Sequence, residues 1–197
     1  MTTHAAPGTG QAEPAEHPPA HLIHTAAGEG PAYWFFDSLA VLRTPAADTS
    51  PAIIEMTVSP DGGAPLHVHP DLDDSFYLLD GQLAMRCGEH TFVARPGDYV
   101  VLPRGVPHTF RVLGSQPARM LQVHQDDSFL RFIRAVGVPA ATAGLPPAMQ
   151  LSVPMEDMTR IAAETGQPVI GPPMSEEEAR QIARAGTGRS AQPSASR

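Results

Sequence analysis

The chain has 197 residues, of which 42% are hydrophobic and 17% are charged, and its formal net charge is −8 at pH 7. A negative chain without a basic cluster lacks the electrostatic footprint of nucleic-acid binding, so we expect no nucleic-acid partner. There is no run of about 18 apolar residues and no basic leader followed by an apolar stretch. We therefore predict neither a membrane span nor a secretory signal.

Composition also limits the covalent chemistry of the chain. The sequence has 13 arginines and no lysine, which excludes a Schiff base on a lysine. The single cysteine, Cys87, cannot form an internal disulfide, and this favours a cytoplasmic location. Cys87 lies in an apparent strand, and we interpret it as a small buried hydrophobic residue rather than a nucleophile.

The length fits one folded region flanked by tails. We predict a disordered tail at 1–27, a barrel at 28–125, a helical extension at 126–186 and a disordered tail at 187–197. The first tail is rich in Ala, Pro, Gly and Thr, and such a composition buries too little apolar surface to fold alone. Its histidines are irregularly spaced, so we interpret them as solvated residues rather than a metal site. They are His4, His17, His21 and His24.

Short apolar stretches separated by turns follow the first tail. The aromatic stretch 31–36 predicts a strand that continues through 38–42 after a kink at Asp37. Asp80-Gly81 is a hairpin signal, and Gly88-Glu89 is a second tight turn. Further strands are predicted at 52–58, 75–79, 82–87, 90–94, 99–102, 107–113 and 118–124. Short strands at such regular intervals, without helical crossovers, are typical of an all-β barrel or sandwich.

Three histidines and a carboxylate stand out within this β region. His67 and His69 are separated by one residue, and side chains alternate in an extended segment, so both imidazoles face the same side. Asp73 and Asp74 follow shortly, and His108 comes from another predicted strand. Three nitrogen donors and one carboxylate suit Fe, Ni, Mn, Co, Cu or Zn and do not suit Ca or Mg. We therefore predict one divalent transition metal per chain on the three histidines and a neighbouring aspartate, with coordination positions left for water or substrate.

These residues resemble the two sequence motifs of the cupin superfamily. The first motif is matched by Gly62, His67, His69, Asp74 and Gly81, and the second by Gly97, Pro103, Gly105 and His108, with Val112 where Asn is usual. The stretches 97–110, 129–132 and 171–173 resemble single-domain bacterial quercetin 2,3-dioxygenase-like proteins. The resemblance covers roughly residues 30 to 180. It implies a cupin jelly-roll β-barrel and a homodimer.

Asp74 occupies a position where the family has Glu. The resemblance implies that this carboxylate binds the metal and, in quercetin dioxygenases, accepts a proton from the substrate hydroxyl. Asp is one methylene shorter, so its carboxylate reaches roughly 1.5 Å less far. Direct ligation, ligation through a water molecule and action as a base behind the metal all stay open. Asp73 faces the other way in an extended segment, and the spacing from Asp74 to Gly81 matches the family motif, so the resemblance makes Asp74 our candidate.

Apolar residues near the predicted site are candidate walls of a substrate pocket, with core packing as the alternative for each. They are Trp34, Phe36, Phe76, Met85, Phe110 and Met120. In the last predicted strand, Gln122 and His124 share a face with Met120. We expect His124 to be a surface residue at the strand end, and the alternative is a pocket residue that accepts a proton.

Beyond the last strand, the apolar period changes to that of helices. A helix is predicted over 129–136, behind N-cap candidates at 126–128, and Gly137 ends it. Further helices are predicted at 154–164 and, from a capping box, at 175–185. We expect these helices to pack outside the barrel or over one mouth of it, as a structural cover rather than a lid.

Three functions fit such a site, and we favour the first. It is a metal-dependent dioxygenase that uses O2 and an aromatic, flavonol-like substrate, with Asp74 as base or ligand. The second keeps the metal as a Lewis acid without O2, for isomerisation, cyclisation or decarboxylation in natural-product biosynthesis. The shorter side chain of Asp74, compared with the Glu of the family, favours this second function. The third is a cupin that binds a small molecule without catalysis.

Overall fold

The structure is a computed structural model that describes residues 22–45 and 51–186. The predicted tail 187–197 and His4, His17 and His21 lie outside the described residues. The strands are β1 (Ala32–Phe35), β2 (Ser38–Leu42), β3 (Ala52–Val58), β4 (Gly63–His67), β5 (Asp74–Asp80), β6 (Leu83–Cys87), β7 (His90–Ala94), β8 (Tyr99–Leu102), β9 (His108–Val112), β10 (Ala118–His124), β11 (Val138–Pro139) and β12 (Val169–Pro173). The helices are α1 (Ser128–Val136), α2 (Met155–Glu164) and α3 (Glu176–Gly186).

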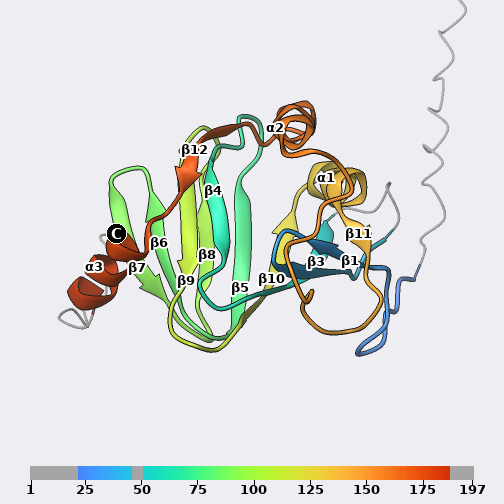
Figure 1. Ribbon diagram of the computed structural model, residues 1–197, viewed down its shortest axis with the longest axis horizontal. Coiled ribbons are helices and arrows are strands. Elements are labelled where there is room, and N and C mark those ends of the chain that lie inside the picture. Colours follow the sequence, from blue (N-terminus) through green and yellow to red (C-terminus); the bar gives the residue numbers. More distant parts are fainter. Residues whose placement is uncertain (1–21, 46–50, 187–197) are drawn as a thin grey trace, which may run out of the picture.

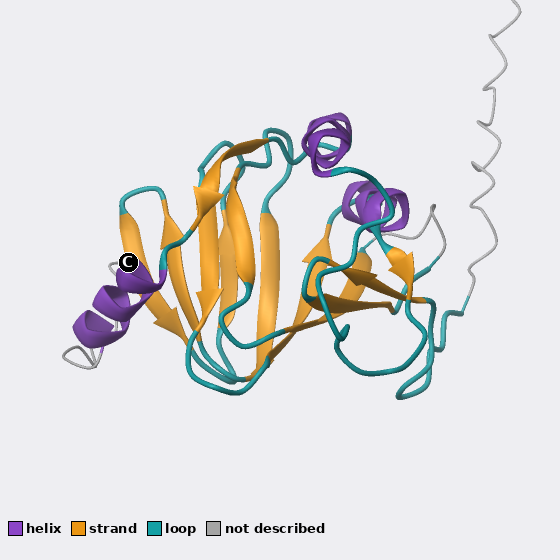
Figure 2. Ribbon diagram, viewed as in Figure 1, coloured by secondary structure: helices purple, strands orange, loops and turns teal. Residues whose placement is uncertain are grey.

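The strands form two sheets, which Figure 1 and Figure 2 show from one side. One sheet has the order β11-β1-β2-β3-β10-β5-β8, and the other has the order β12-β4-β9-β6-β7. Consecutive strands from β3 to β6 and from β7 to β10 lie in alternate sheets, so the chain crosses repeatedly between them. The paired strands are antiparallel, for example β10 with both β3 and β5. This arrangement is a jelly roll, and the predicted all-β class is confirmed.

The core fills the space between the sheets. Every second residue of β3 is buried, and β10 follows the same period of two. Ile54 on β3, Leu78 on β5 and Met120 on β10 are each no more than 1% exposed. Because β10 lies between β3 and β5, its inward side chains are enclosed on both flanks.

The aromatic stretch forms two antiparallel strands, so the prediction of one kinked strand is wrong. Trp34 pairs with Leu39, and Phe35 pairs with Ser38, across the turn between β1 and β2. Phe36 has a φ of 52°, in the left-handed region, where the chain reverses. The reversal comes one residue before the predicted kink and is much sharper.

Asp80 and Gly81 do not form the predicted hairpin, because β5 and β6 lie in different sheets. Gly81 has a φ of 78°, and a Cβ at this position would lie 2.7 Å from Ala118 Cα. Glycine is therefore required here by the close approach of β10. The dipeptide marks a tight connection between the sheets, whereas the turn at Gly88-Glu89 does join two paired strands.

The helices lie on opposite sides of the β structure, as Figure 1 shows. Helix α3 contacts β6 and β7, whereas α1 contacts β1 and α2. The apolar face of α1 buries Phe129, Phe132 and Ile133. The backbone N–H of Glu178 donates a hydrogen bond to Ser175 Oγ over 3.1 Å, which is half of the predicted capping box. Among the described residues, no helix has the length and apolar character needed to cross a membrane.

Candidate metal centre

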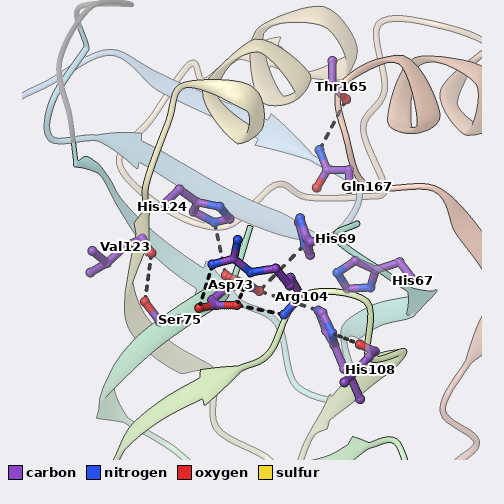
Figure 3. A network of polar contacts seen from close by, with 12 residues as sticks. His67, His69, Asp73, Ser75, Arg104, His108, Val123, His124, Thr165 and Gln167 are labelled. Carbon is purple, nitrogen blue, oxygen red and sulfur yellow. Dashed lines mark hydrogen bonds and ion pairs between the residues drawn. The ribbon is translucent and has the colours of Figure 1, made fainter. Parts of the chain in front are cut away.

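His67 and His108 are brought together by strand pairing. They are register partners at the ends of β4 and β9, and their ring centroids lie 4.3 Å apart. His69 lies just beyond β4, where its carbonyl accepts a hydrogen bond from the backbone N–H of Gly105 over 2.8 Å. This bond ties the loop that carries His69 to the loop before His108. Figure 3 shows the three side chains in one region.

The backbone orients two of these imidazoles. Nδ1 of His67 lies 2.8 Å from the carbonyl oxygen of Pro65, and Nδ1 of His108 lies 3.0 Å from that of Val106. A carbonyl oxygen accepts a hydrogen bond, so Nδ1 carries the proton on each ring. Nε2 then keeps its lone pair and is free to bind a metal.

Asp74, at the start of β5, completes the cluster. Its Oδ2 lies 3.8 Å from His108 Nε2 and 4.0 Å from His69 Nε2. One donor atom from each of His67, His69, Asp74 and His108 falls within 4.8 Å of the others. Donors that sit about 2.1 Å from a shared ion lie about 3 to 4 Å apart, so this spacing suits a single transition metal.

Buried polar atoms without hydrogen-bond partners also indicate a metal site. Nε2 of His108, Nδ1 of His69 and Oδ1 of Asp74 are buried without a hydrogen-bond partner in the described part of the chain. Burying polar atoms without a partner costs free energy, and a metal ion bound to Nε2 of His108 would offset that cost for this nitrogen. The donor set and its burial therefore fit the group that the sequence predicts.

Asp73 points away from this cluster, as its place in the sequence predicts. Its carboxylate accepts hydrogen bonds from the backbone N–H of Arg104 over 2.9 Å and from Arg104 Nε over 3.1 Å. These hydrogen bonds from Arg104 lower the pKa of Asp73. Asp73 and Arg104, both drawn in Figure 3, thus fix the loop before β9 from outside.

Burial controls the charge of the cluster. Desolvation, together with the neighbouring histidines, lowers the pKa of His67 and of His69 to about 3. Burial also raises the pKa of Asp74 to about 6. Without a metal, His67 and His69 are therefore neutral, which is the form of imidazole that binds a metal.

His124 is a member of the site, so its predicted place at the surface is wrong. It is 1% exposed, and its Nε2 lies 3.3 Å from Asp74 Oδ1. Its ring is stacked on Phe129 of α1 with centroids 4.9 Å apart. The enclosed position of β10 and the cover by α1 explain the burial, and neither can be read from the strand pattern alone. Desolvation lowers the pKa of His124 to about 4.

An apolar cavity of about 90 Å³ adjoins these residues. Of the predicted wall residues, Phe36, Phe76 and Phe110 line it. Trp34, Met85 and Met120 are not among its lining residues. Met85 and Met120 are packed in the core instead, and Trp34 donates a hydrogen bond from Nε1 to the carbonyl of Gly144 over 2.8 Å.

Sequence reasoning missed several lining residues. They are Phe35, Gln122, Phe129, Phe132, Met158 and Gln167, with His124. The helical spacing of Phe129 and Phe132 indicates a buried helix face but not what that face covers. Helices α1 and α2 supply cavity walls, so they do more than cover the barrel from outside. Cys87 is buried away from the cavity, and burial raises the pKa of its thiol.

Comparison with known proteins identifies the family. Residues 54–124 match the family described as Cupin domain. The chain contains a cupin domain. This cupin is 27% identical over 138 residues to a quercetin 2,3-dioxygenase from Bacillus subtilis (strain 168). The match covers 69% of this chain and 41% of the relative, so the chain spans less than half of that protein's length.

Two solved structures are similar to this cupin in fold. The polyketide cyclase RemF from Streptomyces resistomycificus is 23% identical, with a TM-score of 0.41 over 66% of this chain and 80% of that chain. An oxalate decarboxylase from Lactobacillus farciminis is 22% identical, with a TM-score of 0.43 over 48% of this chain and 30% of that chain.

Proposed function

We propose that this cupin is a metal-dependent dioxygenase that acts on an aromatic, polyphenolic small molecule and O2. One observation carries the proposal: three imidazoles and a carboxylate converge within 4.8 Å beside an apolar cavity lined by phenylalanine rings. The similarity to a quercetin 2,3-dioxygenase supports the reaction class.

In this proposal His67, His69 and His108 hold one divalent transition metal through nitrogen, and Asp74 offers Oδ2 as a fourth donor. Mixed nitrogen and carboxylate donors suit Fe, Ni, Mn, Co, Cu or Zn. When bound, such an ion supplies a positive charge that favours the deprotonated form of a substrate hydroxyl and an electronic path between substrate and O2.

Asp74 is the residue that would move a proton. Its carboxylate is buried beside the donor set, and burial raises its pKa to about 6. A buried carboxylate is a stronger base than one in water and accepts a proton from a hydroxyl placed within hydrogen-bond reach. His124 lies 3.3 Å from the other carboxylate oxygen, and its ring centroid lies 5.9 Å from that of His69.

The cavity walls select the shape of the substrate. Phe35, Phe36, Phe129 and Phe132 line the cavity, and Phe35 packs edge to face with each of the other three. Such walls contact a planar aromatic ring by dispersion and exclude water from the reacting centre. Gln122 and Gln167 add polar groups that can orient substrate hydroxyls.

A second candidate function is proton transfer without O2, as in an isomerase, cyclase or decarboxylase. The 3.3 Å approach of His124 and Asp74 favours it, because two buried acid-base groups side by side can move a proton between two substrate atoms. A third reading, binding of a small molecule without catalysis, uses the same cavity.

Oxygen uptake separates the first candidate from the others. Metal-loaded protein is mixed with a panel of flavonols and other polyphenols in an oxygen electrode. Substrate-dependent uptake of O2 supports the dioxygenase, and substrate turnover without uptake supports proton transfer. We also propose a cytoplasmic homodimer of secondary metabolism, and light scattering on the purified chain tests the dimer.

A further inference from the structure

The two oxygens of Asp74 have different neighbours. Oδ2 faces Nε2 of His108 at 3.8 Å and Nε2 of His69 at 4.0 Å. Oδ1 lies 3.3 Å from Nε2 of His124. His124 is outside the set of four residues whose donor atoms lie within 4.8 Å of one another. The two oxygens of one carboxylate therefore face different imidazoles, and the ring of the fourth, His124, lies 5.9 Å from that of His69 between centroids.

His124 is held rigidly in this place. Its backbone ends β10, which is paired with β3 on one side and β5 on the other. Its ring is stacked on Phe129 at an interplanar angle of 29°. Neither of its ring nitrogens has a hydrogen-bond partner among the described residues, and both are buried. Asp74 Oδ1 is likewise buried without a hydrogen-bond partner within the described chain, so the two atoms, 3.3 Å apart, can satisfy each other.

We propose that His124 is a positioning residue for Asp74, which directs Nε2–H at Oδ1 and so turns Oδ2 toward the metal. The carboxylate rotates about a single bond, so fixing one oxygen fixes the other. Hydrogen-bond partners behind the ligands orient metal sites in this way. This inference rests on the proposed metal site and assigns to His124 a role distinct from that of a ligand.

Metal affinity without substrate tests the inference on the full chain. Metal-free protein is titrated with Co²⁺ and followed by visible absorption. The variant His124→Phe keeps a ring on Phe129 but removes the N–H, and it should bind one Co²⁺ about 10 to 100 times more weakly. His124→Gln keeps a donor and should recover most of the affinity. His90→Gln, which changes an exposed histidine on β7, should bind like the wild type.

A double-variant cycle with Asp74→Ala separates positioning from a general structural effect. If His124 acts through Asp74, then His124→Phe should weaken Co²⁺ binding no further once Asp74 has been replaced. An equal loss in both backgrounds would overturn the inference, as would unchanged Co²⁺ affinity in His124→Phe.

Pulsed EPR of the Cu²⁺-loaded wild type gives an answer that does not depend on the folding of any variant. Three bound imidazoles are expected, from His67, His69 and His108, and four would make His124 a ligand and overturn the inference. If the wild type does not bind Co²⁺, the proposed metal site itself is refuted. If the wild type binds Co²⁺ and His124→Phe binds it with the same affinity, only the role of His124 is refuted.

Discussion

His67 and His108 are register partners on β4 and β9, with ring centroids 4.3 Å apart. Each donates Nδ1–H toward a backbone carbonyl, which leaves Nε2 for a metal. The strand pairing that builds the second sheet therefore also builds half of the candidate metal centre.

Replacing either histidine should remove the metal. We expect His67→Ala and His108→Ala to bind less than a tenth of the metal that the wild type binds, because each removes one of only three nitrogen donors. The measurement is metal per chain by mass spectrometry after dialysis. The control is His90→Ala, on the exposed side of β7. Unchanged metal content in both site variants would refute the assignment.

Asp74 variants should separate ligation from proton transfer. We expect Asp74→Asn to fold and keep metal but to lose at least 100-fold in kcat, because an amide cannot accept the substrate proton. Asp74→Glu should keep metal while its extra methylene crowds His124. Metal content and turnover are measured on the same samples. Full activity in Asp74→Asn would show that Asp74 is not the base.

The metal-free protein should lose stability in mild acid. Burial lowers the pKa of His67, His69 and His124 to about 3, 3 and 4, whereas histidine in the unfolded chain has a pKa of about 6.5. Below pH 6.5 the unfolded chain binds protons that the folded chain does not, so the free energy of unfolding falls. Asp74 acts in the opposite sense, because its pKa is raised to about 6, but three histidines outweigh one carboxyl.

The expected loss between pH 7 and pH 5 is on the order of 3 kcal/mol. Urea denaturation of chelator-treated protein at the two pH values measures it. The variant His69→Gln should show a smaller loss, since one neutral buried imidazole is gone. A free energy of unfolding that is flat over this range would contradict the burial of neutral histidines in the site.

A substitution in α3 should lower the stability of the protein without changing its metal affinity. Ile182 is 6% exposed and belongs to a small apolar cluster with Val93 and Met174, on the side of β6 and β7 that α3 covers. We expect Ile182→Ala to lower the free energy of unfolding by about 2 to 4 kcal/mol while metal affinity stays within twofold. Denaturation and Co²⁺ titration measure the two effects. A parallel loss of Co²⁺ affinity would show that α3 supports the site.

Local patterns predict much of this molecule. The alternation of apolar residues predicts most strands to within one residue of their observed limits. The spacing of His67 and His69 indicates the candidate metal site. Helical spacing likewise predicts α1. These features depend only on neighbours along the chain.

Two of the failures concern which elements meet in space. The burial of His124 depends on β10 lying between β3 and β5 and on α1 covering its end. The dipeptide Asp80-Gly81 has the composition of a hairpin, but the strands on either side belong to different sheets. Strand register and sheet membership decide which face of a strand lines the cavity, and a single sequence does not determine either of them.

Oxygen consumption by metal-loaded protein distinguishes a dioxygenase from an enzyme that only transfers protons. Wild-type protein, with its metal content measured, is placed in an oxygen electrode with a panel of flavonols, and His67→Ala is the matched control. We expect about one metal per chain, and O2 uptake that requires the substrate and is lost in His67→Ala. Full metal occupancy without O2 uptake on any polyphenol would contradict the dioxygenase and leave proton transfer as the chemistry of this cupin.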